Sequence, residues 1–187
     1  MKFTSALLLP LFLLALAAPL SAATVFFDLQ GKAGAGLLPG NENGTVSGSP
    51  GTGGEIGGGI FFDDVTKLLT INVGWGSANG FTNLTGNATA MHIHGPASFT
   101  ANAGVLIGLD SLGGYNSSAT AGGFSGTTTL TATNEARLLA GTLYINVHTS
   151  TNGGGEIRGN LVAVPEPSRV LLAAMGGLLL GLRRRRA

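Results

Sequence analysis

The sequence predicts an all-β fold, either an antiparallel β-sandwich or a barrel-like single domain. Glycine accounts for 32 of the 187 residues and charged residues for only 10%, a composition that argues against a helical bundle and against a charged, disordered chain. Short strand-like runs are separated by clusters of Gly, Asn and Ser, which is typical of antiparallel sheets. Residues 24–163 lie between two apolar ends and are sufficient for one ordinary domain core.

The expected strands follow one another along this segment without a convincing long-period repeat. Asp63 and Asp64 separate two of them and predict a hairpin turn. Only residues 134–140 are expected to be helical, for at most two turns. Residues 31–59 form the least regular stretch, for which we expect a long surface loop. The strands are expected at residues 25–30, 58–62, 68–75, 88–94, 105–109, 126–131, 143–149 and 156–162.

Charge and cysteine content exclude several classes of function. Residues 24–163 hold eight acidic and four basic side chains, a net charge of −4. Binding to phosphate backbones requires clustered Lys and Arg, so nucleic acid is not an expected partner. The chain contains no Cys, which excludes disulfides, thiolate zinc sites and a cysteine nucleophile.

The N-terminal residues 1–23 have the pattern of a Sec signal peptide. Lys2 supplies the positive charge, residues 7–18 form an apolar stretch, and Ser21-Ala22-Ala23 is a small-residue cleavage site. An uncleaved anchor is disfavoured because about a dozen apolar residues fall short of the roughly 20 that span a bilayer. We therefore expect handling by the Sec translocon and signal peptidase, and a mature chain that begins near Thr24.

The C-terminal residues 164–187 have three parts. Pro165-Glu166-Pro167 precedes an apolar, Gly-spaced run at residues 170–182, which as a helix would be about 20 Å long, short of the roughly 30 Å hydrocarbon core unless the bilayer thins locally. A basic block follows and would keep the C-terminus on the cytoplasmic side. It consists of Arg183, Arg184, Arg185 and Arg186.

This tail closely resembles the PEP-CTERM sorting signal of Gram-negative bacteria. The resemblance implies that an exosortase in the inner membrane recognises the tail and removes it, after transient anchoring by the hydrophobic helix. The domain would then reach the cell surface or the extracellular matrix, where exopolysaccharide or a surface protein is the expected partner. An ordinary C-terminal membrane anchor is the alternative.

All three histidines lie in expected strands, on the side away from the aliphatic residues. Side chains alternate across a strand, so His92 and His94 point away from Met91 and Ile93. The same alternation groups His148 with Tyr144 and Asn146, opposite the aliphatic residues of that strand, and groups Glu156 and Arg158 with Asn160 on the last strand. If residues 150–155 form a turn, His148 and Glu156 are near cross-strand neighbours.

Two motif blocks resemble the CHRD domain, which is named for chordin. The first is Met91-His92-Ile93-His94-Gly95-Pro96-Ala97. The second runs from Tyr144-Ile145-Asn146-Val147-His148-Thr149 to Gly155-Glu156-Ile157-Arg158-Gly159-Asn160-Leu161. The sequence differs from the family at Gly36-Leu37-Leu38-Pro39-Gly40-Asn41-Glu42, where an acidic-Val-Pro-Pro element is usual. The resemblance implies an all-β extracellular module with no established catalytic chemistry.

The polar face allows two interpretations. His92, His94 and His148 offer three imidazole nitrogens to a single Zn or Cu ion, with a fourth position for water. Alternatively, the histidines form a structural hydrogen-bond cluster with the neighbouring polar residues Tyr144, Asn146, Glu156 and Arg158. We therefore expect a surface or matrix binding module without catalytic residues. The alternative is a metal enzyme of superoxide dismutase type, since His92-Ile93-His94 resembles the His-x-His strand of that β-sandwich.

Overall fold

The computed structural model describes residues 23–116 and 119–165. The expected signal sequence, apart from Ala23, lies outside these residues. So does the tail beyond Pro165, including Glu166, Pro167, the apolar run 170–182 and the four arginines. Within the described residues, no helix has the length and apolarity that a membrane span requires.

The described chain is almost entirely β-structure, with one short α-helix. The larger strands are β1 (Thr24–Gly31), β4 (Gly53–Asp63), β5 (Leu68–Trp75), β6 (Ala88–His94), β7 (Val105–Gly108), β9 (Gly122–Thr129), β10 (Tyr144–Thr149) and β11 (Ile157–Ala163). The short elements are β2 (Gly34–Ala35), β3 (Leu38–Pro39), η1 (Ser77–Asn79), β8 (Tyr115–Asn116) and α1 (Ala132–Leu139).

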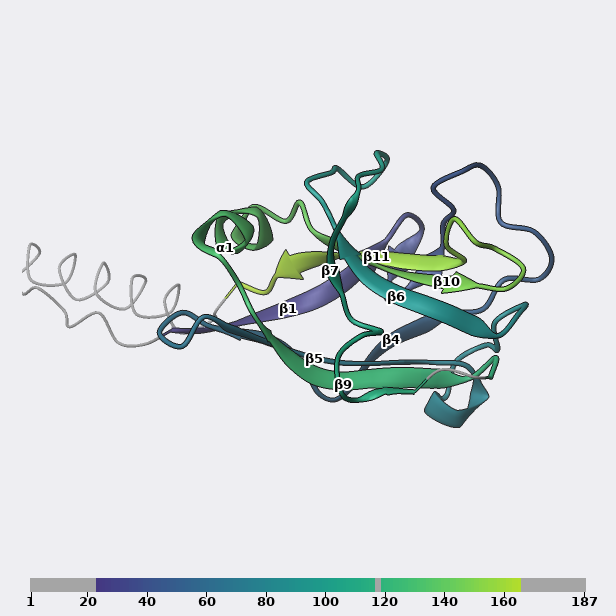
Figure 1. The fold of residues 1–187 in the computed structure, drawn as a ribbon, viewed down its shortest axis with the longest axis horizontal. Helices are drawn as coiled ribbons and strands as arrows, with labels where there is room; N and C mark the ends of the chain where they lie inside the picture. Colours follow the sequence, from purple (N-terminus) through teal and green to yellow (C-terminus); the bar gives the residue numbers. More distant parts are fainter. Residues whose placement is uncertain (1–22, 117–118, 166–187) are drawn as a thin grey trace, which may run out of the picture.

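The strands form a single antiparallel sheet in the order β7-β6-β10-β11-β1-β4-β5-β9-β8, with β2 paired to β1 and β3 to β11. The sheet curls into a half-barrel, so that β6, β10 and β11 lie over β4, β5 and β9, and β1 connects the two halves (Figure 1). The predicted all-β, barrel-like fold is therefore confirmed.

The core fills the inside of the curl. Met91, Ile93 and Ile145 from one half belong to the same buried cluster as Ile71 and Trp75 from the other. These residues alternate with polar ones along their strands, which is the pattern that places one face of a sheet inside. Helix α1 adds the buried Leu138 to this cluster. Thr131 caps its N-terminus, since the Thr131 side chain accepts a hydrogen bond from the Asn134 amide.

Most of the predicted strand positions are confirmed, two of them, 68–75 and 88–94, to the residue. The turn at Asp63 and Asp64 is confirmed as well, because Asp63 Oδ1 accepts hydrogen bonds from the amides of Val65 and Thr66, each at 2.9 Å. The prediction of a long loop at 31–59 is confirmed for residues 40–52, which belong to no strand or helix, and is wrong for the rest of the stretch. That stretch contains β2, β3 and the first part of β4, where glycines occupy strand positions and hide the alternation.

Two irregular segments cover the outer face of β6, β10 and β11. We call residues 40–52, between β3 and β4, the first cover loop, and residues 95–104, between β6 and β7, the second cover loop. They are joined where Asn102 Nδ2 donates to the Glu42 carbonyl at 2.7 Å. Because of this cover, five of the six residues of β10 are buried, on both faces of the strand.

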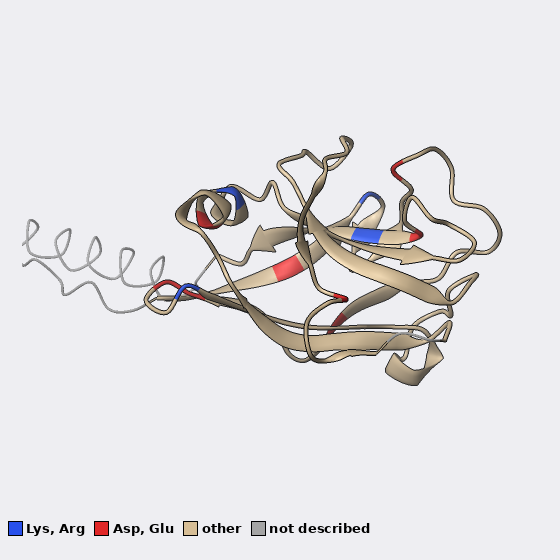
Figure 2. Ribbon diagram, viewed as in Figure 1, with Lys and Arg blue, Asp and Glu red and all other residues tan. Residues whose placement is uncertain are grey.

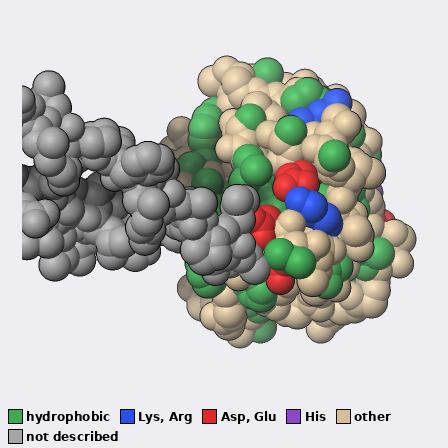
Figure 3. All heavy atoms as spheres, turned by 90° about the vertical axis from the view of Figure 1, so that its left-hand side faces the viewer, with side chains coloured by type: hydrophobic (Ala, Val, Ile, Leu, Met, Phe, Trp, Pro, Cys, Tyr) green, Lys and Arg blue, Asp and Glu red, His purple; other side chains and the backbone are tan. Residues whose placement is uncertain are grey.

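The charged residues are few and dispersed over the fold (Figure 2). The view onto the end of the molecule that carries α1 shows single apolar side chains scattered among polar ones, and a few acidic and basic groups close together (Figure 3). One contact between opposite charges is Lys67 Nζ to Glu135 Oε1, at 2.8 Å. The described surface therefore has no concentrated basic patch, in keeping with its acidic net charge.

Candidate metal centre

The strand register brings the histidines together on the outer face of the sheet. Tyr144 stands opposite His94, and Asn146 stands opposite His92. Directly opposed residues of antiparallel strands point to the same side, so the residues with odd numbers on β10 face the core and those with even numbers face the cover loops. The predicted separation of polar and aliphatic faces is confirmed, and His148 follows on the same side as Tyr144 and Asn146.

The three imidazoles form a compact group. One ring nitrogen from each of His92, His94 and His148 lies within 4.8 Å of the other two. The ring centroids are 4.8 Å apart for His92 and His148, and 5.6 Å apart for the two pairs that include His94. Nitrogens at these separations are close enough to share one ion at the usual Zn–N distance of about 2.0–2.1 Å after small side-chain rotations.

Each histidine has an oxygen acceptor beside one of its two ring nitrogens. His94 Nδ1 lies 2.9 Å from the Ala103 carbonyl oxygen and 3.0 Å from Glu42 Oε1. His148 Nδ1 lies 2.9 Å from the Gly153 carbonyl oxygen. His92 Nε2 lies 3.4 Å from Asp110 Oδ1. An oxygen acceptor favours a proton on the adjacent nitrogen, which leaves the lone pair on the other nitrogen of each ring.

The remaining nitrogens are those that face one another or have no partner. His92 Nδ1 and His148 Nε2 are 3.1 Å apart. His94 Nε2 is buried and has no hydrogen-bond partner within the described part of the chain. If the outer nitrogens carry the protons, the lone pairs of His92 Nδ1 and His148 Nε2 face each other, which is unfavourable unless a proton or a metal ion sits between them.

Burial favours the neutral form of His92 and His94. Loss of hydration lowers the pKa of His94, and the nearby Glu42 carboxylate opposes this only in part. Loss of hydration and the proximity of His148 lower the pKa of His92. Neutral imidazole is the form that binds metal ions, so the electrostatics of the site favour a ligand over a cationic histidine.

Tyr144 and Arg158 extend this cluster beneath the cover loops. The Tyr144 ring stacks on His94, with centroids 5.1 Å apart, and the Arg158 guanidinium lies 3.6 Å from the Tyr144 ring centroid. Burial and the hydrogen bond to Glu42 raise the pKa of Tyr144 to about 12. Arg158 donates to Asn102 Oδ1 at 2.8 Å and to the Ala101 carbonyl at 3.1 Å, which holds the second cover loop against the sheet.

Glu156 does not join the histidines. Val147 and Ile157 are registered partners, so Glu156 comes next in register across from His148, but its carboxylate binds the loops instead. It accepts hydrogen bonds from the amides of Gly51 and Thr85, at 2.9 and 2.6 Å, and from the side chains of Thr149 and Asn152. The group of polar residues expected from the sequence is therefore divided into a histidine cluster and a separate carboxylate site.

Asn146 lies between the opposed residues His92 and Arg158 in the register. Its Nδ2 donates to the Gly154 carbonyl at 3.5 Å, while its Oδ1 is buried and has no partner among the described residues. The backbone of Gly155 packs directly on this amide, because a Cβ there would lie 2.2 Å from Asn146 Oδ1. Gly155 also has a φ of 104°, a conformation that strongly favours glycine.

Sequence reasoning missed the oxygen acceptors around the histidines. Glu42 comes from the first cover loop, Asp110 follows β7, and the other two acceptors are backbone carbonyls. Backbone carbonyls leave no trace in a sequence. The signal available for Glu42 was its position as the one acidic residue between Asp28 and Glu55.

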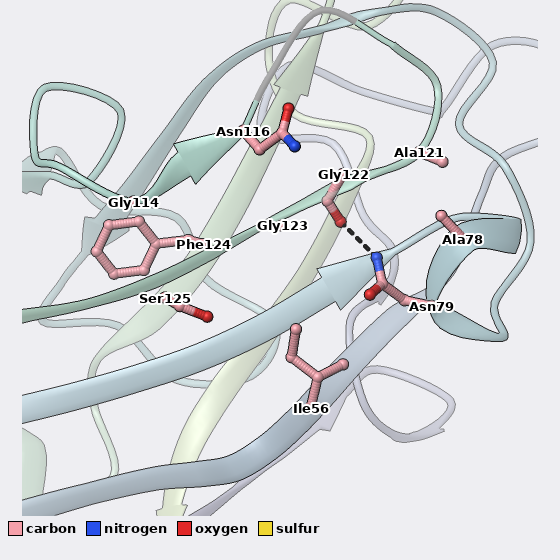
Figure 4. A pocket seen from close by; sticks show the side chains of 10 residues that line it. All are labelled: Ile56, Ala78, Asn79, Gly114, Asn116, Ala121, Gly122, Gly123, Phe124 and Ser125. Atoms are coloured by element: carbon pink, nitrogen blue, oxygen red, sulfur yellow. Dashed lines mark hydrogen bonds between the residues drawn. The ribbon is translucent and has the colours of Figure 1, made fainter.

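A pocket of about 320 Å³ lies elsewhere, at the end of β5 and β9 (Figure 4). Its lining includes Gly114, Gly122 and Gly123, and Asn79 donates to the Gly122 carbonyl at 2.8 Å. None of its lining residues titrates or ligates metal as His, Asp or Glu does. The chemically distinctive residues of the described chain are therefore at the histidine cluster.

The fold and this cluster define a small antiparallel β domain that carries a covered polar face. The CHRD domain family matches the chain over residues 34–161, which include every residue of the cluster. The chain therefore belongs to the CHRD domain family. No curated protein and no solved structure matches it.

Proposed function

We propose that this CHRD protein is an exported module of the cell surface or extracellular matrix that binds one Zn²⁺ or Cu²⁺ ion through His92, His94 and His148. The observation that carries the metal site is the arrangement of ring nitrogens. Each histidine has an oxygen acceptor beside one ring nitrogen, and one ring nitrogen from each of the three lies within 4.8 Å of the other two. Metal-ligating histidines almost always have such an acceptor at the nitrogen that does not bind the metal.

The proposed site is open on one side. His94 is almost fully buried, with 3% of its side chain exposed, whereas 21% of the His92 side chain and 30% of that of Asp110 are accessible. Three imidazoles leave a fourth position of a tetrahedral ion for water or an outside ligand. A second ion finds no comparable set of His, Asp and Glu within the described residues, so nothing here favours the two-metal centre of a superoxide dismutase.

Metal titration tests the site. The full-length chain, stripped with chelator, should take up about one Zn²⁺ or Cu²⁺ per chain, and free metal at about 100 times the dissociation constant should add about 2.7 kcal/mol to the free energy of unfolding. His94→Ala and His148→Ala should abolish uptake. Asn72→Ala, which removes a polar side chain on β5 away from the cluster, is the matched control and should bind normally. If the wild type takes up no metal by calorimetry, the cluster is structural.

The two ends of the chain support the proposed export. Residues 1–23 have the signal-peptide pattern, and the Pro165-Glu166-Pro167 tail with its arginine block has the pattern of an exosortase substrate. In this proposal the signal peptide is removed near Thr24, the tail anchors the chain briefly in the inner membrane, and an exosortase releases the domain to the surface. Association with exopolysaccharide follows from that destination.

Intact-mass measurement of secreted or surface material tests the sorting. The chain should begin near Thr24 and lack residues 170–187. Replacing the four arginines by Glu should impair membrane orientation, because the positive-inside bias is lost, whereas Lys67→Glu, a charge reversal within the domain, should not. A stable inner-membrane population that keeps the complete C-terminus would contradict processing by an exosortase.

A further inference from the structure

Glu42 reaches the histidine cluster from the first cover loop. Its backbone is fixed on both sides, because its amide donates to the Gly154 carbonyl at 2.9 Å and its carbonyl accepts from Asn102 Nδ2 at 2.7 Å. Its side chain is 17% exposed and points under the loop, where Oε1 lies 3.0 Å from His94 Nδ1. The same oxygen accepts the hydrogen bond of the Tyr144 hydroxyl.

The carboxylate acts on His94 by two routes. The first is direct, because a carboxylate oxygen beside Nδ1 requires an N–H there. The second passes through Tyr144. The Tyr144 hydroxyl, held by Glu42, accepts from the Ala103 amide at 3.0 Å, and the Ala103 carbonyl is the other acceptor beside His94 Nδ1, at 2.9 Å. One side chain therefore positions both oxygens that hold the proton on Nδ1.

The remaining nitrogen of His94 is thereby defined. With the proton on Nδ1, Nε2 carries a lone pair, and this is the buried atom that has no hydrogen-bond partner among the described residues. A buried nitrogen without a hydrogen-bond partner destabilises the fold. The network thus keeps an unpaired lone pair on His94, in a ring whose centroid lies 5.6 Å from those of His92 and His148, at a cost to the metal-free fold.

We propose that Glu42 is the positioning residue of this centre: it fixes His94 in the Nδ1–H tautomer and so presents Nε2 to the metal ion. This inference rests on the proposed metal site. Glu42 does not itself bind the ion, because its carboxylate lies at the outer nitrogen of the ring. It acts as the carboxylate of a carboxylate–histidine–metal triad, a type of partner whose loss typically lowers metal affinity about 10- to 100-fold.

A purely structural role for Glu42 predicts different behaviour. In that case its function would be to hold the cover loops together, and any substitution that loosens them would have the same effect. Asn102 provides the matched control. It links the Glu42 carbonyl to the Arg158 guanidinium, whereas the acceptors beside His94 Nδ1 are Ala103 O and Glu42 Oε1. Asn102→Ala therefore loosens the loops but keeps both acceptor groups, and the Glu42 amide remains bound to the Gly154 carbonyl.

The experiment compares wild type, Glu42→Gln and Asn102→Ala as full-length chains. Long-range ¹H–¹⁵N correlation spectra of the imidazoles give the tautomer of His94 without metal, and titration with Zn²⁺ gives the affinity. We expect the Nδ1–H form in the wild type and in Asn102→Ala. We expect mixed tautomers and an affinity about tenfold weaker in Glu42→Gln, whose uncharged amide is a poorer acceptor.

The inference is overturned if Glu42→Gln keeps both the tautomer and the affinity of the wild type, or if Asn102→Ala lowers the affinity as much. Should Glu42→Gln fail to fold, the wild-type spectrum decides, since an Nε2–H form of His94 excludes the proposed arrangement. A wild type that binds no Zn²⁺ refutes the metal site instead, and the tautomers alone then decide whether Glu42 positions His94.

Discussion

Strands β9 and β10 lie in opposite halves of the same curled sheet and differ in what covers their outer face. In β9 the exposure alternates, with Phe124 buried and Ser125, Thr127 and Thr129 exposed. In β10 the outward residues Tyr144 and Asn146 are as buried as the core residues between them. The outer side chains of β9 are small and solvated, whereas those of β10 are polar and contact groups of β6 and of the surrounding loops.

The comparison shows how to interpret a polar residue on a strand. On an open face a polar side chain needs only water, and its identity is lightly constrained. Beneath a cover loop each polar atom needs a partner from the protein, since an unsatisfied buried group costs about 1–3 kcal/mol. A face that is both polar and covered therefore carries groups kept for a specific arrangement, and in this chain that arrangement includes all three histidines.

The largest expected difference between the covered and the open face is in the stability lost on substitution, and it concerns Glu156. Glu156→Ala leaves four donors without an acceptor, from Gly51, Thr85, Thr149 and Asn152, and should lower the free energy of unfolding by about 3 kcal/mol or more. Thr127→Ala on the open face of β9 should change it by less than about 0.5 kcal/mol. Urea denaturation measures both. Equal effects would show that the cover loops add nothing to stability.

A smaller effect on the free energy of unfolding should appear when Glu156 of the covered face is protonated at low pH. Burial alone would raise the pKa of Glu156, but the hydrogen bonds from Gly51, Thr85, Thr149 and Asn152 outweigh it and lower the pKa below the ordinary value of 4.5. Between the two pKa values, Glu156 binds more protons in the unfolded chain than in the folded one. The stabilisation by the ionised carboxylate is therefore complete above about pH 4.5, and it is lost as the pH falls through the lower, folded-state pKa.

Glu156→Gln, which cannot ionise, is the comparison for this effect. The wild type should be the more stable of the two at pH 7, and its advantage should shrink below pH 4.5 when urea midpoints are measured in parallel. An advantage that is independent of pH would mean that the carboxylate is not ionised in the folded protein.

The smallest effect is expected on the exposed side, at the turn between β4 and β5. Asp63 Oδ1 accepts the amides of Val65 and Thr66, each at 2.9 Å, and these bonds lower the pKa of Asp63. Because the turn is solvated and water can replace the lost acceptor, Asp63→Ala should lower the free energy of unfolding far less than Glu156→Ala does, as read from thermal unfolding. A loss comparable to that of Glu156→Ala would remove the contrast between open and covered faces.

The strands were predictable where alternating residues define a face. Residues 68–75 and 88–94 contain enough Leu, Ile, Val and Met for the period of two to be visible, and the same alternation placed the histidines opposite the core. It failed in Gly53–Asp63, because the five glycines of β4 have no side chain to mark a face. Residues 31–59 looked like a loop for this reason.

The site was predictable only in its ligands. His92, His94 and His148 could be grouped because strand alternation places all three on the side away from the aliphatic residues. Glu42, by contrast, is about 50 residues from His94 in the sequence, and the route of the first cover loop depends on contacts such as the Gly40 amide with the Glu156 carbonyl at 3.0 Å. The direction of the Glu156 side chain likewise depends on amides from two distant loops, which no local pattern encodes.

The pairing of the first and last strands has a geometric consequence for the domain as a whole. Phe27 and Ala163 are registered partners, and the Val164 amide donates to the Phe26 carbonyl at 2.8 Å, so the chain enters and leaves the sheet side by side. Arg158 lies five residues before Ala163 on the same strand, a distance of about 17 Å at about 3.4 Å per residue. A tether attached just beyond residue 164 would therefore be separated from the histidine cluster by about this distance. The separation would be set by the length of β11.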